Sequence, residues 1–230
     1  MKKLVVLTGA GISAESGLKT FRDSEGLWQG HDIMEVATPQ GWRKNQELVL
    51  DFYNQRRRQL HKVQPNRGHK TLYELENNFD VYIITQNVDN LHEKAGSSNI
   101  IHLHGELLKV RSVKDKNYIL HWETDLRKTD IDKNGFQLRP HIVWFGEDVP
   151  ALEEAIEITQ KADYFVVIGT SLQVYPAAGL IEYIKPKIPI YYIDPNPISI
   201  RNLSNTIEII PMNASDGVPL LKTKLISLNN

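Results

Sequence analysis

The chain has 230 residues, of which 41% are hydrophobic and 24% are charged, and its formal net charge is −1. These values are typical of a globular protein with one large domain, and without a long basic run they give no reason to expect nucleic-acid or membrane-surface binding. The absence of cysteine excludes disulfides, thiolate metal ligands and a cysteine nucleophile.

The amino-terminal segment has two lysines after Met1, followed by a short apolar stretch. This stretch, Leu4 to Leu7, is too short for the hydrophobic region of a signal peptide. No run in the chain approaches the 18 apolar residues that a membrane-spanning helix needs. We therefore expect a cytoplasmic protein without a membrane partner.

Seven short apolar runs end in glycine or polar residues and predict β-strands. Most are continuous rather than alternating, which is typical of parallel strands buried on both faces. The runs are 4–9, 81–87, 100–105, 141–146, 164–171, 188–194 and 207–211. Segments with helical spacing follow or lie between them at 65–78, 150–162, 175–184 and 218–228. This alternation predicts an α/β fold with a Rossmann-like, doubly wound parallel sheet.

Two segments interrupt the alternation. Residues 24–62 contain a long helical pattern, and residues 107–140 are polar and rich in lysine. We expect both insertions to form a smaller lobe within a single domain spanning 1–230, and the Rossmann-like lobe to comprise approximately 1–23, 63–106 and 141–230. A cleft between two lobes is a common place for a ligand.

The first predicted strand runs into a glycine-rich turn. Gly9-x-Gly11-x-x-Ala14 fits the dinucleotide fingerprint, in which glycines let the backbone approach a pyrophosphate. The alternative is an ordinary glycine-rich turn. The acidic residue that usually follows about 20 positions later is present only as Asp23 or Glu25, outside any predicted strand. The pattern therefore does not indicate a standard dehydrogenase.

Small polar residues also follow two later strands. Thr170 and Ser171 end one strand, and Asp194 and Asn196 end the next. Each group alone has an alternative interpretation as turn chemistry. Because open α/β sheets bind ligands at the carboxyl ends of their strands, several such groups on one edge favour a nucleotide.

The stretch "TQNVDNLHEKAGSSNIIHLHGE" places Gln86, Asn87 and Asp89 after one strand and His104 at the end of the next. Unpaired polar groups are costly to bury, so this arrangement favours a polar ligand among them. A histidine is a natural general base near neutral pH, and its alternative is a satisfied core histidine. His102 and His104 form a His-x-His pair, but without a clear third ligand we expect no metal.

The motifs "GAGISAESGLKTFR", "TQNVD", "HG", "VWFGE", "GTSLQVYPAA" and "ASDGVP" occur in this order. Together they closely resemble the sirtuin family of NAD-dependent protein lysine deacylases, over nearly the whole chain. The segment "GLWQGHDIMEVATP…FYNQRRRQL" is most similar to bacterial members of the desuccinylase (class III) group. The resemblance implies removal of succinyl, malonyl and acetyl groups from lysine side chains of proteins.

The resemblance also assigns residues to the co-substrate NAD. Those expected to contact NAD are Gly9, Ala10, Gly11, Glu15, Phe21, Arg22, Trp28, Gln86, Asn87, Val88, Asp89, Gly169, Thr170, Ser171, Asp194, Pro195, Asn196 and Ala214. Many relatives have asparagine where Asp194 stands.

For the reaction, the resemblance implies that His104 is the catalytic base and that Asn87 acts with it. The acyl oxygen of the modified lysine attacks C1′ of the nicotinamide ribose, and nicotinamide leaves, helped by Asp89. His104 takes a proton from the ribose hydroxyls, so that the 2′-oxygen attacks the acyl carbon, and water then releases lysine and O-acyl-ADP-ribose. The acyl-lysine tunnel and peptide strand are matched by Val143, Phe145, Gly146 and Glu147.

Tyr53 and Arg56 are three residues apart on a predicted helix, 46–62, and share a face. From the sequence pattern alone, Tyr53 can be a core residue, and Arg56 can pack its aliphatic part against the core while its guanidinium reaches solvent. In the desuccinylase group, Tyr-x-x-Arg binds the carboxylate of succinyl- or malonyl-lysine, and this is the interpretation we adopt. Arg57 and Arg58 are expected to be solvated.

Most sirtuins carry C-x-x-C…C-x-x-C in the insertion that corresponds to 107–140, which here has no cysteine. We therefore expect no structural zinc, and packing of the small lobe through Val110, Tyr118, Ile119, Leu120, Trp122 and Leu138.

Two other functions stay open at this point. Some sirtuin-like proteins are mono-ADP-ribosyltransferases, and the missing cysteines are compatible with a non-catalytic module that binds NAD or ADP-ribose. The presence of Asn87, Asp89 and His104 argues against a non-catalytic binding module. A nicotinamide dehydrogenase is the least favoured interpretation.

Overall fold

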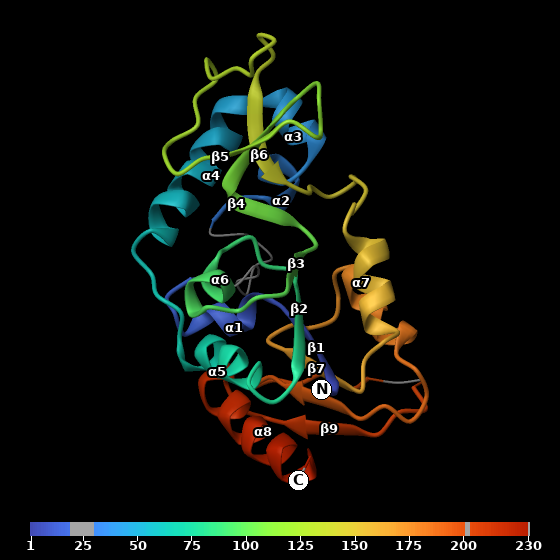
Figure 1. Cartoon of the computed structure of the whole chain (residues 1–230). Helices are drawn as coiled ribbons and strands as arrows, with labels where there is room; N and C mark the ends of the chain where they lie inside the picture. Colours follow the sequence, from blue (N-terminus) through green and yellow to red (C-terminus); the bar gives the residue numbers. More distant parts are fainter. Residues whose placement is uncertain (19–29, 201–202, 230) are drawn as a thin grey trace.

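The computed structural model describes residues 1–18, 30–200 and 203–229 (Figure 1). Two sheets organise these residues: a six-stranded sheet of order β3-β2-β1-β7-β8-β9 and a three-stranded sheet of order β5-β4-β6. All neighbouring strands of the larger sheet are parallel. Its strands are β1 (Lys3–Thr8), β2 (Asp80–Thr85), β3 (Ile100–His102), β7 (Tyr164–Ile168), β8 (Ile190–Ile193) and β9 (Ile207–Ile210).

The larger sheet is buried on both faces. Along β1, Leu4 and Val6 belong to one core, and Val5 and Leu7 to another on the opposite face. The first core is covered by α1 (Ala10–Ala14), α5 (Arg67–Leu75) and α8 (Ala214–Asn229). The second is covered by α7 (Leu152–Thr159) and the 3₁₀ helix η1 (Ala177–Tyr183) (Figure 1). The predicted doubly wound α/β fold is confirmed.

The order of the strands creates a switch point. From β1 the chain adds β2 and β3 on one side, whereas β7, β8 and β9 build the other side. The carboxyl ends of β1 and β7 therefore meet where the strand order reverses, which is the usual ligand position in such sheets.

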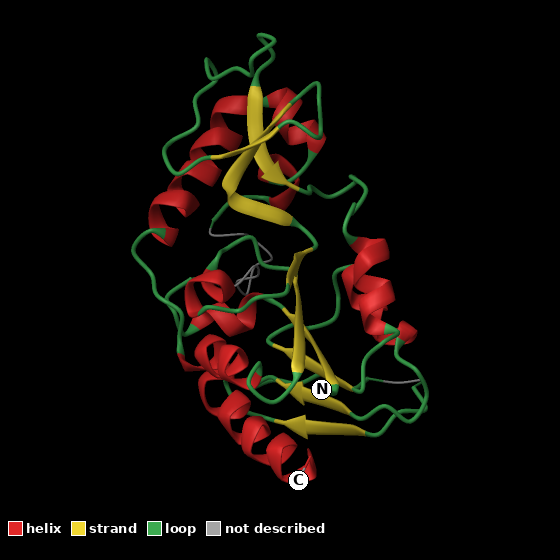
Figure 2. Cartoon of the chain, in the orientation of Figure 1, coloured by secondary structure: helices red, strands yellow, loops and turns green. Residues whose placement is uncertain are grey.

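The smaller sheet forms the second lobe, seen at the top of Figure 2. Its strands β4 (Gly105–Ser112), β5 (Ile119–His121) and β6 (Leu138–Ile142) are antiparallel. They share a third core with α2 (Ile33–Val36), α3 (Pro39–Lys44), α4 (Gln46–Leu60) and α6 (Leu91–Ala95). The side chain of Asn45 caps α4 by accepting a hydrogen bond from the amide of Leu48 at 3.1 Å.

Three sequence expectations need correction. The strand predicted at 141–146 begins earlier, as β6, and pairs with β4 in the small sheet rather than joining the parallel sheet. The strand predicted at 100–105 ends at His102, because the chain turns before Gly105, whose φ is +83°. Ile119 is 42% exposed and does not contribute to the small core. Its neighbours Tyr118 and Leu120 do pack there.

No helix within the described ranges has the length and apolar character needed to cross a membrane.

Candidate active site

Two glycine turns contact each other at the switch point. The amide of Gly11 donates to the carbonyl oxygen of Gly169 at 2.8 Å. A Cβ atom on Gly11 would lie 2.6 Å from the Cα of Gly169, and one on Gly9 would lie 2.6 Å from its carbonyl oxygen. No side chain fits between these backbones. The glycines after β1 are therefore required by close approach to the turn after β7, and the predicted approach of a pyrophosphate to them stays a prediction.

Polar side chains from neighbouring strands meet at the same edge. The side-chain amide of Gln86, after β2, donates to the hydroxyl of Thr170, after β7, at 3.0 Å. The side-chain amide of Asn87 donates to the carbonyl oxygen of Gly9 at 3.0 Å. The predicted groups at the ends of β1, β2 and β7 are thus brought together by direct contacts.

Asn87 belongs to a buried polar network that the sequence did not predict. Ser13 on α1 accepts from the amide of Asn87 at 3.2 Å and donates to the carboxylate of Asp89 at 2.9 Å. His69 lies 3.5 Å from the same hydroxyl, and its ring packs on that of His92, with 4.9 Å between centroids. Burial raises the pKa of Asp89 and lowers that of His69 to about 4. The signal in the sequence is a serine at the first turn of the helix after the glycines.

His104 is fixed by its backbone and by one ring nitrogen. Gly105, which follows it, has φ +83°, and a Cβ there would lie 2.1 Å from the carbonyl oxygen of His141, so only glycine fits. The Nδ1 atom of His104 donates to the carbonyl oxygen of Gln86 at 3.0 Å. Burial lowers the pKa of His104, although this hydrogen bond raises it. A neutral ring with the proton on Nδ1 leaves Nε2 as an acceptor.

His102 and His104 do not converge on one point. The Nδ1 atom of His102 lies 3.3 Å from the carbonyl oxygen of Asn87, and that of His104 faces the carbonyl of Gln86. The two histidines therefore hold successive carbonyl groups of the same loop, and the His-x-His pair is no bidentate metal site.

The segment after β6 carries the residues expected to bind the peptide. The amide of Val143 donates to the carbonyl oxygen of His104 at 2.9 Å, which joins this segment to the predicted base. Phe145 is 40% exposed, and its amide donates to the carbonyl oxygen of Ala37 at 2.9 Å. Both carboxylate oxygens of Glu147 accept from Arg111 and Arg139, and one also accepts from the amide of Trp144. Glu147 therefore secures the turn that carries Phe145.

Tyr53 and Arg56 lie on the buried face of α4. Tyr53 is completely buried, and its hydroxyl accepts from the indole nitrogen of Trp144 at 3.0 Å. The guanidinium of Arg56 stacks on Phe52, 3.4 Å from the ring centroid, and donates to the carbonyl oxygen of Phe52 at 2.6 Å. Burial raises the pKa of Tyr53 and lowers that of Arg56 to about 10, so both stay protonated at neutral pH.

The expectation that Arg57 is solvated is wrong. Its side chain is 1% exposed because β4 packs against that face of α4, and its Nε donates to the carbonyl oxygen of Leu107 at 3.1 Å. Its Nη1 donates to the side chain of Asn54 at 2.7 Å. Arg58 is exposed, as predicted, and pairs with Asp51 and Asp125.

The remaining predicted NAD residues lie on or after α1, in the loops after β2, β7 and β8, at the start of α8, or outside the described residues. Asp194 follows β8 and accepts from the amide of Asn196 at 2.8 Å. Glu15 accepts from the amide of Ser215, beside Ala214, at 2.9 Å. Ala10 lies on α1; Val88, Ser171 and Pro195 lie in the loops after β2, β7 and β8. Phe21, Arg22 and Trp28 lie outside the described residues.

A doubly wound parallel sheet with touching glycine turns at its switch point, joined to a small antiparallel lobe, defines a two-lobed α/β protein of the Rossmann-like class. Residues 9–176 match the model of the Sir2 family, and the chain belongs to that family.

Relatives match over almost the whole chain. A Helicobacter pylori (strain ATCC 700392 / 26695) protein named NAD-dependent protein deacylase is 58% identical over 228 residues, which are 99% of each chain. A Bacteroides thetaiotaomicron protein of the same name is 54% identical over 233 residues, 98% of this chain and 99% of that one.

Solved structures of Sir2 proteins share the fold of this chain. A Sir2 homologue in complex with NAD has a TM-score of 0.85 at 37% identity, covering 100% of this chain and 91% of that one. A Sir2 protein bound to acetylated peptide has a TM-score of 0.78 at 27% identity, covering 96% and 92%.

Proposed function

We propose that the protein is an NAD-dependent protein lysine deacylase that removes succinyl, malonyl and acetyl groups. Membership of the Sir2 family and the names of the close relatives support the NAD-dependent deacylase activity. The observation that carries the proposal is the position of His104. Its ring is held through Nδ1 by Gln86 at the glycine-lined edge, and its backbone is held by Val143 of the peptide segment.

Bound NAD supplies a ribose carbon that becomes electrophilic as nicotinamide departs. The turns at Gly11 and Gly169 expose backbone without side chains at the carboxyl edge of the sheet, where phosphate groups of NAD would bind, and the amino terminus of a helix follows the first turn. Asn87 and Asp89, fixed by Ser13, present amide and carboxyl groups to the nicotinamide end.

His104 acts as the general base through Nε2. The hydrogen bond from Nδ1 to Gln86 fixes the tautomer and the orientation of the ring, so that the free nitrogen is ready to accept a proton from a ribose hydroxyl. Val143, whose backbone amide donates to the carbonyl oxygen of His104, lines the way to the substrate lysine together with Phe145 and Gly146. Glu147 holds this segment rather than contacting the acyl group.

Tyr53 and Arg56 give the preference for acyl groups that end in a carboxylate. The support is their burial on one face of α4 with both groups protonated, and the contact of the Tyr53 hydroxyl with Trp144 of the peptide segment. A guanidinium can bind a carboxylate bidentately, and a protonated tyrosine can add a third hydrogen bond. Acetyl-lysine carries no carboxylate on its acyl group and does not need these two contacts.

The small lobe is stable without the structural zinc of other sirtuins. Residues 107–140 contain no cysteine, and His121, paired with Glu123, is the histidine of that segment. Such donors do not fit a tetrahedral structural zinc site. The shared core of the small sheet and α2 to α4, together with the ion pairs of Glu147, supports a lobe held by packing. The cytoplasmic location and the division at 24–62 and 107–140 stay predictions.

The experiment uses the purified chain, NAD and two peptides that differ only in carrying acetyl- or succinyl-lysine. Mass spectrometry follows free lysine and O-acyl-ADP-ribose for the parent, Arg56→Met and His104→Ala. We expect the parent to remove both groups, Arg56→Met to lose succinyl but keep acetyl removal, and His104→Ala to lose both. NAD binding without release of either acyl group would contradict the proposal and favour a binding module. ADP-ribosylated protein without lysine release would favour a transferase.

A further inference from the structure

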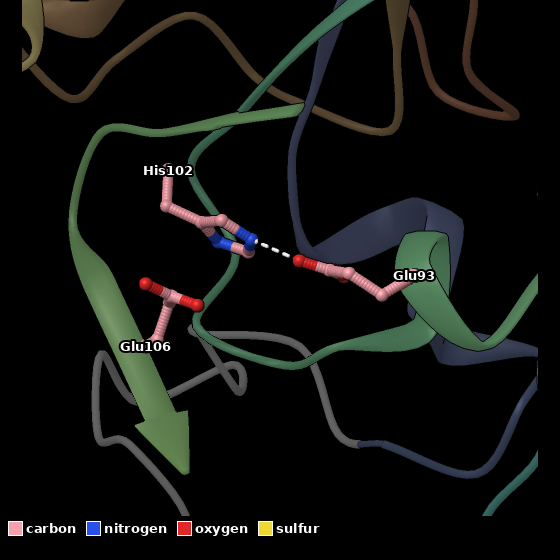
Figure 3. Close-up of side chains that lie close together, drawn as sticks. All are labelled: Glu93, His102 and Glu106. Atoms are coloured by element: carbon pink, nitrogen blue, oxygen red, sulfur yellow. Dashed lines mark hydrogen bonds and ion pairs between the residues drawn. The ribbon is translucent and has the colours of Figure 1, made fainter. Parts of the chain in front are cut away.

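Three side chains that commonly bind metals converge where the two sheets join. Glu93 comes from α6, His102 from the end of β3 and Glu106 from the start of β4 (Figure 3). One donor atom from each lies within 4.8 Å of the others. The Nε2 atom of His102 is 2.6 Å from a carboxylate oxygen of Glu93, and Figure 3 shows the carboxylate of Glu106 beside the same ring. Among the described residues, no other group of three potential metal ligands has donor atoms this close together.

We propose that Glu93, His102 and Glu106 bind one divalent transition-metal cation, for which Zn²⁺ is the best fit. One imidazole and two carboxylates are a donor set that suits zinc, and three protein ligands leave the fourth position to water. The set lacks the six oxygens in octahedral array that Mg²⁺ requires. This site lies outside residues 107–140, where other sirtuins hold their structural zinc, and it does not include His104.

The orientation of His102 is that of a metal ligand with a supported ring. Its Nδ1 faces the carbonyl oxygen of Asn87 at 3.3 Å and donates to it. Metal-binding histidines almost always donate their second ring nitrogen in this way, which fixes the tautomer and directs the other nitrogen to the metal. Here that other nitrogen, Nε2, points at Glu93.

The charge of the surrounding hollow favours a cation. Its volume is about 360 Å³. Its walls carry three carboxylates, those of Glu93, Glu106 and Glu154, and one ammonium group, that of Lys109. Lys109 binds one carboxylate oxygen of Glu106 at 2.5 Å, which leaves the second oxygen for a metal. A surplus of carboxylates in a concave site raises the local concentration of cations.

A cation at this place would connect the segments on both sides of His104. His102 and Glu106 are each two residues from His104, and Glu93 ties α6 to them. The alternative is a closed set of ion pairs, in which protonated His102 pairs with Glu93 and Lys109 pairs with Glu106. The two states differ in whether the chain binds a metal ion.

The test is a calorimetric titration of Zn²⁺ into the full chain, purified without a histidine tag and treated with a chelator. We expect one Zn²⁺ per chain and a rise in Tm when it binds. His102→Gln and Glu106→Gln should each weaken binding about tenfold or more. The controls are His61→Gln, an exposed histidine, and Glu157→Gln, an exposed carboxylate paired with Lys161, which should bind as the parent does.

Circular dichroism of each variant shows whether it is folded. Glu106 is only partly buried, so Glu106→Gln decides the question even if His102→Gln does not fold. Absence of binding to the parent, or binding that both variants leave unchanged, would overturn the proposal. Because the readout is binding rather than turnover, this result is independent of the deacylase experiment.

Discussion

The Nδ1 atom of His104 lies 3.0 Å from the carbonyl oxygen of Gln86, an atom that can only accept a hydrogen bond. The proton of the neutral ring is therefore on Nδ1, and Nε2 has a free lone pair. The loop after β2, whose side chains contact the glycine turn, thus also determines which nitrogen of the predicted base is available.

Replacing His104 with alanine separates catalysis from NAD binding. We expect kcat/KM for acetyl and succinyl peptides to fall by roughly 10²- to 10⁴-fold, because general base catalysis is lost. Calorimetry should find NAD affinity close to that of the parent, since the contacts of Gly9, Gly11 and Gly169 do not involve the histidine. A variant that turns over at the parental rate would remove His104 from the mechanism.

Because the two glycine turns approach each other closely, we predict that one added methyl group at Gly11 lowers both stability and NAD affinity. In Gly11→Ala, the new Cβ would lie 2.6 Å from the Cα of Gly169, so the turns must separate, at a cost of about 1–3 kcal/mol in unfolding free energy. NAD affinity should fall as well. Gly179→Ala is the matched control, because its Cβ would make an ordinary contact of 3.7 Å with the ring of Tyr175. Equal NAD affinity in the two variants would contradict the assignment of this edge.

Glu147 tests whether the peptide segment depends on its ion pairs. Its carboxylate is bound by Arg111, Arg139 and the amide of Trp144, and the arginine side chains are at most 10% exposed. Glu147→Gln leaves two buried guanidinium groups poorly compensated, so urea unfolding should show a loss of about 3 kcal/mol.

The KM of Glu147→Gln for peptide should rise more than its KM for NAD, because the segment that carries Phe145 loses its anchor. Glu157→Gln, which removes an exposed ion pair with Lys161, should change neither quantity. A rise confined to the KM for NAD would place Glu147 in a different role.

The predictable part of the site is local in sequence. Gly11 and Gln86 follow strands whose continuous apolar character is visible in the chain, and parallel strands bring their carboxyl ends to one edge. The same logic placed His104 near this edge. The fold class and the three strand ends could therefore be derived, although the pairing of β6 with β4 could not, since antiparallel and parallel partners look alike in a short apolar run.

The unpredicted part depends on contacts between distant residues. Arg57 is buried only because β4 crosses that face of α4, and a helical pattern cannot reveal this. His69 and His92 are 23 positions apart, and the contact of their rings depends on how α5 and α6 pack. The same holds for Glu147, whose two arginine partners come from β4 and β6.

The buried pair of His69 and His92 makes stability dependent on pH in the acid range. Burial lowers the pKa of His69 to about 4 in the folded protein, against 6.5 when it is exposed on unfolding. A depressed pKa means that the unfolded state binds the proton first, so stability is fully present above pH 6.5 and is lost as the pH falls towards 4. Between pH 7 and pH 5 His69 alone accounts for a loss of about 2 kcal/mol.

His69→Asn should reduce this loss. Urea unfolding of the parent and the variant at pH 7 and pH 5 measures it, and His61→Gln serves as the control with an exposed histidine. If the parent and His69→Asn lost equal free energy between the two pH values, His69 would not be the group that takes up the proton.

The hydrogen bond between Tyr53 and Trp144 connects acyl selection to the peptide segment. Tyr53→Phe removes the acceptor of the buried indole N–H, which should cost about 1–3 kcal/mol in unfolding free energy. It also removes a donor expected to face the carboxylate of succinyl-lysine. Because hydrogen bonds to charged groups are worth about 1.5–3 kcal/mol, kcat/KM for the succinyl peptide should fall about tenfold or more relative to the acetyl peptide. Tyr118→Phe, at the edge of the small core, should leave that ratio unchanged. If Tyr53→Phe lowered both activities equally, the tyrosine would support the fold of the lobe without selecting the acyl group.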